Sequence, residues 1–240
     1  MADPTFNRYA TADRAFDRGS FDEGLRQHML RVFNYMGAGL VVTGLVAFLV
    51  SGSPALMQAI FATPLKWVVM LAPLAFVMVL SFGINRLSFA SAQAVFWAYC
   101  AAMGLSLSAI FLVFTGASIA LTFFVTSATF LAMSLYGYTT KTDLTKMGSF
   151  LMMGVFGILI AGLANLFFQS PALQFAISVL GVVIFTGLTA YDTQAIKEQY
   201  AEGYDRESQG KLALMGALTL YLDFINLFQF LLQFLGQRDE

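Results

Sequence analysis

The stretch that decides the fold, residues 212–235, reads LALMGALTLYLDFINLFQFLLQFL. It is apolar along almost its whole length, and at about 1.5 Å per helical residue it is long enough to cross the hydrocarbon core of a bilayer. A continuous apolar run is typical of a transmembrane helix, whereas the strands of a membrane barrel alternate apolar and polar residues. The stretch therefore predicts a membrane-spanning helix that carries one aspartate, Asp223.

Six further stretches have the same apolar character: 32–50, 65–84, 91–114, 117–136, 147–168 and 173–192. Short segments with turn-forming residues separate most of them, and a longer charged connection at 193–211 precedes the last one. We therefore predict an all-α membrane protein with seven transmembrane helices. Its transmembrane domain covers residues 32–235, and a short C-terminal tail covers residues 236–240.

The composition agrees with a membrane protein. Hydrophobic residues make up 58% of the 240 residues and charged residues only 11%, against about 25% charged in an ordinary soluble domain. The net charge of −1 gives no indication of a nucleic-acid partner. One cysteine, Cys100, and one histidine, His28, cannot supply the ligands of a zinc or iron site, so no resident cofactor is expected.

Residues 1–31 form a hydrophilic segment before the first span, and it does not have the short basic start of a secretory signal. Basic and acidic residues are interleaved in it, among them Arg8, Asp13, Arg14, Asp17, Arg18, Asp22, Glu23 and Arg26. We expect a cytoplasmic tail that is disordered, with a short helix along the membrane surface as the alternative.

The basic residues predict the orientation. Seven spans place eleven basic residues on the side of the N-terminus: Arg8, Arg14, Arg18, Arg26, Arg31, Arg86, Lys141, Lys146, Lys197, Arg206 and Lys211. The opposite side holds Lys66 and Arg238. Because cytoplasmic loops carry the excess of Lys and Arg, we expect a cytoplasmic N-terminus and a C-terminus on the far side.

Two aspartates lie in apolar surroundings. Asp223 lies eleven residues into the last span, about 16 Å along the helix axis, where Thr219, Asn226 and Gln233 form a polar stripe with it. Such a stripe must face protein or water, and an ionisable residue at this depth is usually functional, although a structural role is the alternative. Asp192 ends the sixth stretch, and it reaches the level of Asp223 if the helix continues past it; otherwise it is a solvated helix-end carboxylate.

If the two carboxylates meet, elementary electrostatics predicts their behaviour. Two like charges a few ångströms apart in a low dielectric do not both ionise readily, so the pair shares one proton and can act as a proton-regulated gate. Without the proton, Asp192 and Asp223 offer hard oxygen ligands that suit Ca²⁺. Arg86, at the cytoplasmic end of the second span, is the candidate latch that competes for a carboxylate, or else an anchor of the positive-inside kind.

Residues 189–194 (TAYDTQ) and 220–228 (LYLDFINLF) resemble the paired signature of the Bax inhibitor-1 family, and bacterial members are similar in length and architecture. The resemblance implies six helices, in two layers of three, around a central C-terminal helix. It also implies a pH-sensitive calcium leak in the cell inner membrane, with Asp192 and Asp223 as pH sensor and gate and Arg86 as the positional match to an arginine latch. Some members have an acidic residue within the second span, and residues 67–84 have none. Bacterial members are also linked to the regulation of a membrane-bound AAA+ protease.

Two other classes were compared with this assignment. Intramembrane aspartyl proteases also place aspartates on consecutive spans, and Tyr191-Asp192 matches one half of their pattern. The other half is absent, because Leu220-Tyr221-Leu222 precedes Asp223 where glycines are needed, so we expect no enzyme. A regulatory protein that acts on a membrane AAA+ protease without transporting ions remains the alternative function.

Overall fold

The computed structural model describes residues 4–201 and 204–237, with side chains from Asp22 onward. Its described part contains α1 (Pro4–Ser51), α2 (Pro54–Phe61), α3 (Leu65–Gly83), α4 (Phe89–Leu107), the 3₁₀ helix η1 (Ser108–Leu112), α5 (Gly116–Thr139), α6 (Thr145–Phe168), α7 (Pro171–Glu198) and α8 (Arg206–Leu235). Seven of these helices are long and apolar enough to cross a membrane. The predicted all-α class and the seven spans are therefore confirmed.

Capping residues fix where several spans begin. Ser88, Thr115 and Ser170 precede α4, α5 and α7, and the side chain of each accepts a hydrogen bond from a backbone N–H of the first turn. Asp205 caps α8 in the same way. A polar side chain at this position satisfies N–H groups that have no partner within the helix. The turn residues that separated the apolar stretches in the sequence are thus the helix starts themselves.

Three boundaries differ from the sequence-based expectation. Residues from Pro4 onward belong to the continuous helix α1, so the prediction of a disordered tail is wrong for them. The side chain of Glu23 bonds Arg26 and Gln27 one turn on, which is the pattern that supports a helix in a charged segment. The short helix α2 was not predicted, and α8 begins at Arg206, so the connection after α7 is much shorter than the predicted 193–211.

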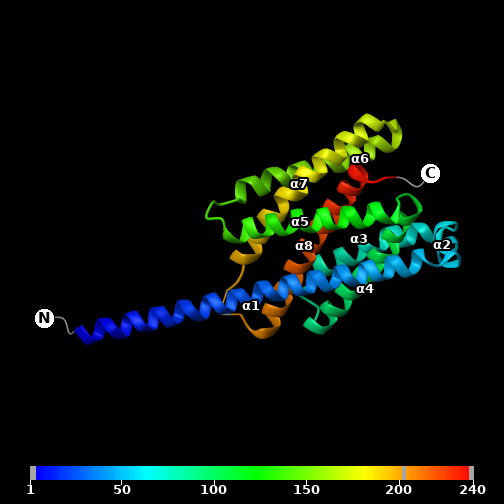
Figure 1. Cartoon of the computed structure of the whole chain (residues 1–240). Helices are drawn as coiled ribbons and strands as arrows, with labels where there is room; N and C mark the ends of the chain where they lie inside the picture. Colours follow the sequence, from blue (N-terminus) through cyan, green and yellow to red (C-terminus); the bar gives the residue numbers. More distant parts are fainter. Residues whose placement is uncertain (1–3, 202–203, 238–240) are drawn as a thin grey trace.

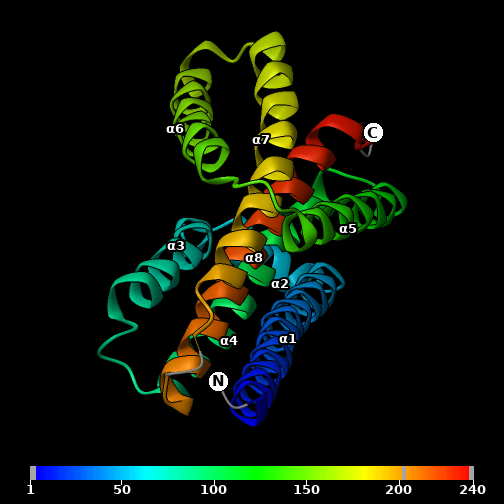
Figure 2. The ribbon, with the colours of Figure 1, turned by 90° about the vertical axis from the view of Figure 1, so that its left-hand side faces the viewer.

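The last helix, α8, is the most buried span. Of the residues in its most apolar part 67% are buried, against 17% for α3 and 11% for α6. Four spans pack on α8, namely α1, α4, α5 and α7, whereas α3 packs mainly on α4, and α6 mainly on α7 (Figure 2). The arrangement of six helices around a central one is therefore not confirmed, because α3 and α6 lie outside the shell around α8.

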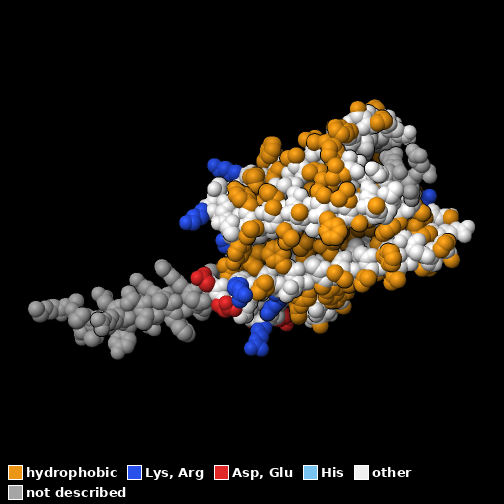
Figure 3. All heavy atoms as spheres, viewed as in Figure 1, with side chains coloured by type: hydrophobic (Ala, Val, Ile, Leu, Met, Phe, Trp, Pro, Cys, Tyr) orange, Lys and Arg blue, Asp and Glu red, His pale blue; other side chains and the backbone are white. Residues whose placement is uncertain are grey.

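The outer surface is suited to a bilayer. Large hydrophobic side chains cover the flanks of the bundle (Figure 3). The most exposed of the large hydrophobic side chains include Phe82 and Phe167, at 81% and 87%. Lys and Arg side chains gather mainly at the end of the bundle from which α1 projects (Figure 3). The first helix starts at this end, and α8 finishes at the opposite end (Figure 1). An apolar belt with a basic end is the pattern of a membrane protein.

Candidate functional site: the Asp192–Asp223 pair

The structure brings the two predicted aspartates together. The sixth span continues past its apolar stretch to Glu198, as the interpretation of Asp192 required, so Asp192 lies one and a half turns inside α7. Asp223 of α8 is only 4% exposed, and Asp192 is partly buried. Their side chains lie within hydrogen-bonding distance of each other.

The chemistry of this contact depends on a proton. Ionised carboxylates only accept hydrogen bonds, so a bond between two of them requires that one be protonated. The buried atom Oδ2 of Asp223 accepts no hydrogen bond from the N–H and O–H groups that the structure describes. Among the described side chains, the Asp192 carboxyl is the group that interacts with the Asp223 carboxyl.

A pocket of about 410 Å³ lies beside the pair, between α6, α7 and α8. Four of its lining residues are polar: Asp192, Thr219, Asp223 and Asn226. The others are apolar or aromatic: Met152, Val155, Ile158, Leu159, Phe185, Leu188, Leu222 and Phe230. The pair thus lines an otherwise apolar space inside the spans.

The predicted polar stripe of α8 divides into two parts. The hydroxyl of Thr219 donates to Met215 O at 3.1 Å, and the amide of Asn226 donates to Leu222 O at 2.8 Å. These bonds use donor hydrogens and leave an oxygen of each side chain as an acceptor or ligand beside the pocket. Gln233 lies outside the pocket lining, and its Oε1 accepts from Gln174 Nε2 at 2.6 Å on α7.

Two side chains just after Asp192 fasten the extended end of α7. The side chain of Gln194 accepts from the N–H of Leu144 at 2.8 Å and donates to the carbonyl of Thr142 at 2.9 Å. Lys197 Nζ donates to the carbonyl of Tyr138 at 2.8 Å. These three bonds tie α7 to the end of α5 and to the α5–α6 connection, and so fix the level of Asp192. Gln194 lies within the quoted motif 189–194, but no pattern in the sequence indicates its partner.

Arg86 is not brought to the pair. It lies exposed in the turn after α3. The described side chains form two ion pairs, Arg26–Glu23 and Lys211–Glu207, and Arg86 takes part in neither. Its role as a latch stays a prediction.

The described residues contain no cluster of three or more His, Cys, Asp or Glu side chains that could hold a metal ion. A Ca²⁺ ion at the pair would therefore take two carboxylates from this chain. Its remaining ligands would be neutral oxygens such as those of Thr219 and Asn226, completed by water.

A second buried polar cluster lies on the other side of α8, and sequence reasoning missed it. The hydroxyl of Thr43 on α1 donates to the carbonyl of Cys100 at 2.9 Å and lies 2.7 Å from the hydroxyl of Tyr221. The ring of Tyr99 packs edge-on against that of Tyr221, with centroids 5.2 Å apart. This cluster joins α1, α4 and α8.

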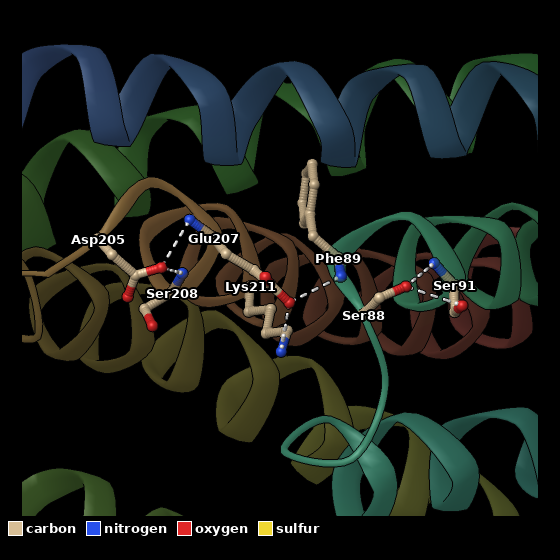
Figure 4. A network of polar contacts seen from close by, with 7 residues as sticks. All are labelled: Ser88, Phe89, Ser91, Asp205, Glu207, Ser208 and Lys211. Carbon is tan, nitrogen blue, oxygen red and sulfur yellow. Dashed lines mark hydrogen bonds and ion pairs between the residues drawn. The ribbon is translucent and has the colours of Figure 1, made fainter.

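A third polar network joins the basic ends of α4 and α8. Glu207 binds Lys211 at 3.0 Å and accepts from the N–H of Phe89 at 3.3 Å (Figure 4). Asp205 accepts from the N–H groups of Glu207 and Ser208. Hydrogen bonds from Ser208 hold the pKa of the Asp205 carboxyl below its usual value.

The chain is similar to proteins from several bacteria. It is 48% identical to the uncharacterised protein RP147 of Rickettsia prowazekii over 92% of this chain and 94% of that protein. It is 47% identical to a Caulobacter vibrioides protein over 98% and 99% of the two chains. It is 45% identical to the inner membrane protein YbhL of Escherichia coli over 90% and 93%. Residues 25–240 match the family described as inhibitor of apoptosis-promoting Bax1. The chain therefore belongs to the Bax inhibitor-1 family, as the two motifs around Asp192 and Asp223 predicted.

Proposed function

We propose that this membrane protein is a pH-sensitive leak for calcium or a similar cation, gated by Asp192 and Asp223. The observation that carries the proposal is the contact between two carboxyl groups inside the spans, beside a pocket whose lining is otherwise mainly apolar. An intramembrane ionisable group is costly to bury and usually marks an ion or proton pathway.

The proton controls the contact between α7 and α8. While one proton is present, the hydrogen bond between the carboxyl groups holds the two helices together at this level. When the proton leaves, two negative charges face each other in a low dielectric, and their repulsion favours separation of the helices. Because the pocket lies next to the pair, such a separation opens the space between α6, α7 and α8.

The ionised pair would also attract the ion. Carboxylate oxygens of Asp192 and Asp223, with the neutral oxygens of Thr219 and Asn226, form the kind of ligand set that a hard divalent cation prefers. The apolar remainder of the pocket offers an ion no ligand. The same deprotonation that loosens the helices therefore creates the ion's binding groups.

The location and orientation follow from two further observations. The relative YbhL is an inner membrane protein by name, and we infer the same membrane for this chain. The basic end of the bundle faces the cytoplasm under the positive-inside rule, which puts the start of α1 there and the end of α8 on the far side.

The test uses purified protein in liposomes that contain a calcium indicator. Wild type is expected to pass Ca²⁺ at a rate that changes with pH, and Asp192→Asn and Asp223→Asn are each expected to abolish that change. Asp205→Asn is the matched control, because it neutralises a carboxylate of the same chain that caps α8 outside the spans. Absence of flux in wild type, or an unchanged pH dependence in both pair variants, would reject the leak.

A second candidate function rests on the first helix. Helix α1 extends beyond the rest of the bundle at the basic end (Figure 1). A projecting helix of mixed charge could dock on a membrane-bound AAA+ protease and regulate it without ion transport. Deleting residues 1–21 tests this, because Leu25 and Met29 at the start of the packed part of α1 are kept. Loss of partner binding on this deletion, together with absence of Ca²⁺ flux in the wild-type protein, would favour the regulatory function over the leak.

A further inference from the structure

A polar pocket at the basic end of the bundle is separate from the aspartate pair. It has a volume of about 840 Å³ and lies between α1 and the starts of α4 and α8. Two arginines from different helices, Arg31 of α1 and Arg206 of α8, line it together with Gln27, Ser88 and Gln209. Neither the pair nor the Thr43–Tyr221 cluster contributes to this pocket.

The charges around the pocket leave the two arginines without an anionic partner in the described structure. The one acidic residue in the lining, Glu207, already binds Lys211 and the N–H of Phe89 (Figure 4). Asp205 is occupied as the cap of α8. The other described ion pair, Arg26–Glu23, lies within α1. No described acidic side chain therefore pairs with Arg31 or Arg206, and both can bind an anion.

A second pocket continues from the first along α1. It shares Gln27, Arg31 and Tyr35 with the polar pocket and adds Leu30, Asn34, Ala38 and Trp97, of which only Asn34 is polar. Ala38 is seven residues beyond Arg31, about 10 Å deeper along the helix. The ring centroids of Trp97 and Tyr35 lie 6.2 Å apart, so two neighbouring aromatic rings line the deeper part of this pocket. The surface thus changes from basic to apolar in the direction of the bilayer interior.

We propose that these two pockets bind one anionic phospholipid. The phosphate group lies between Arg31 and Arg206, and an acyl chain follows Ala38 and Trp97 into the membrane. Basic pockets between transmembrane helices on the cytoplasmic side bind anionic headgroups in this way, and arginine is well suited to phosphate oxygens. A free phosphate would use only the polar pocket, whereas a lipid uses both, which is why the continuity of the pockets favours the lipid.

The single tryptophan in the deeper pocket provides the probe. The other tryptophan, Trp67, lies at the start of α3, so a Trp67→Phe protein keeps Trp97 as its sole indole. This protein is reconstituted in phosphatidylcholine vesicles with a small fixed fraction of either phosphatidylglycerol or phosphatidylcholine that carries brominated chains. We expect brominated phosphatidylglycerol to quench Trp97 fluorescence more strongly, because it is enriched at the site.

Replacing the arginines tests the headgroup contact. Arg31→Gln and Arg206→Gln are each expected to lower the preference for phosphatidylglycerol by about fivefold, and the double variant to remove it. Lys141→Gln/Lys146→Gln is the matched control, because it removes two positive charges from the exposed α5–α6 region and is expected to leave the preference unchanged. Circular dichroism and the thermal unfolding midpoint verify that each variant is folded.

Three results would overturn the proposal. The first is equal quenching by the two brominated lipids in the wild-type background. The second is an equal loss of preference in the lysine control, which would mean general attraction to a negative surface. The third is relief of the quenching by inorganic phosphate added to the solution, which would make this a site for a soluble phosphate compound.

Discussion

The two buried polar clusters on α8 use their hydrogen-bonding atoms in different ways. On the side of α1 and α4, the Tyr221 and Thr43 hydroxyls bond each other, and Thr43 also donates to a backbone carbonyl. On the side of α7, Asp223 meets another carboxyl group, and its Oδ2 receives no hydrogen bond from a described donor. The bond between the Tyr221 and Thr43 hydroxyls forms without any added proton, whereas a bond between two carboxyl groups needs one. Beside the first cluster, the buried hydroxyl of Tyr99 has no described partner either, but it is a neutral group.

This difference separates a structural group from a functional one. A buried polar group with its partners in place stabilises the packing of the helices around it. A carboxyl pair that needs a proton to form its bond makes the packing of α7 on α8 depend on pH. Because a pocket lies beside the pair, a change in this packing also changes the space between α6, α7 and α8. Depth in the membrane alone would not distinguish Tyr221 from Asp223, because both are buried on the same helix.

The largest expected effect tests how closely the structural side is packed. An alanine Cβ at Gly104 of α4 would lie 2.6 Å from the Thr43 carbonyl oxygen and 2.7 Å from Val46 Cβ on α1. We expect Gly104→Ala to lower the free energy of unfolding by about 1–3 kcal/mol, because α1 and α4 must move apart. Gly157→Ala on α6 is the control, since no atom lies within 4 Å of the added carbon. Equal stability of the two variants in detergent would contradict the close packing.

The next effect tests whether the hydroxyl cluster is purely structural. Thr43→Val removes the partner of the buried Tyr221 hydroxyl and is expected to cost about 1–2 kcal/mol of unfolding free energy. Adding Tyr221→Phe removes the orphaned hydroxyl and should restore part of that loss. Chemical denaturation in detergent measures both. The pH dependence of ion flux should be the same in both variants as in wild type, and a shift would mean that the two sides of α8 are coupled.

The smallest effect concerns Asp205, a solvent-exposed carboxylate at the start of α8. Asp205 accepts hydrogen bonds at the start of α8, and its pKa is lowered in the folded protein. A lowered folded-state pKa means that the stabilisation is fully present above the unfolded pKa of about 3.9 and is lost as the pH falls through the folded value. The unfolding midpoint of Asp205→Ala should therefore lie slightly below that of wild type at pH 7. The difference should shrink in acid, and a constant difference would contradict the titration of this cap.

The sequence predicted the helices better than their arrangement. Apolar length and the basic asymmetry were enough for seven spans, because each span satisfies its own backbone hydrogen bonds and needs no information about its neighbours. The sequence alone left open whether the sixth span continues past Asp192. Residues 193–200 contain no glycine or proline, and the structure continues α7 to Glu198, which carries Asp192 to Asp223. The layout around α8 was not predictable in this way, since α3 and α6 are as apolar as the spans that pack on it.

In the candidate site, too, some residues could be predicted from local sequence patterns and others could not. Asp223 stood out because a carboxylate is rare in an apolar run, and Thr219 and Asn226 followed from the helical repeat. Thr43, Tyr221 and Gln194 gave no such signal, because their residue types are common in such helices and their partners lie far away in the sequence. The pocket beside the pair depends on where α6 lies, and no local sequence pattern predicts the position of α6.

The most direct test of the central claim is a double-mutant cycle on the pH dependence of calcium flux. Wild type, Asp192→Asn, Asp223→Asn and the double variant are compared in the same liposomes, with the protein content of each preparation equalised. If the two carboxyl groups share one proton as a unit, either single variant removes the pH dependence, and the double variant behaves like the singles. Two independent shifts that add in the double variant, or a wild-type pH profile in either single variant, would contradict a shared-proton gate.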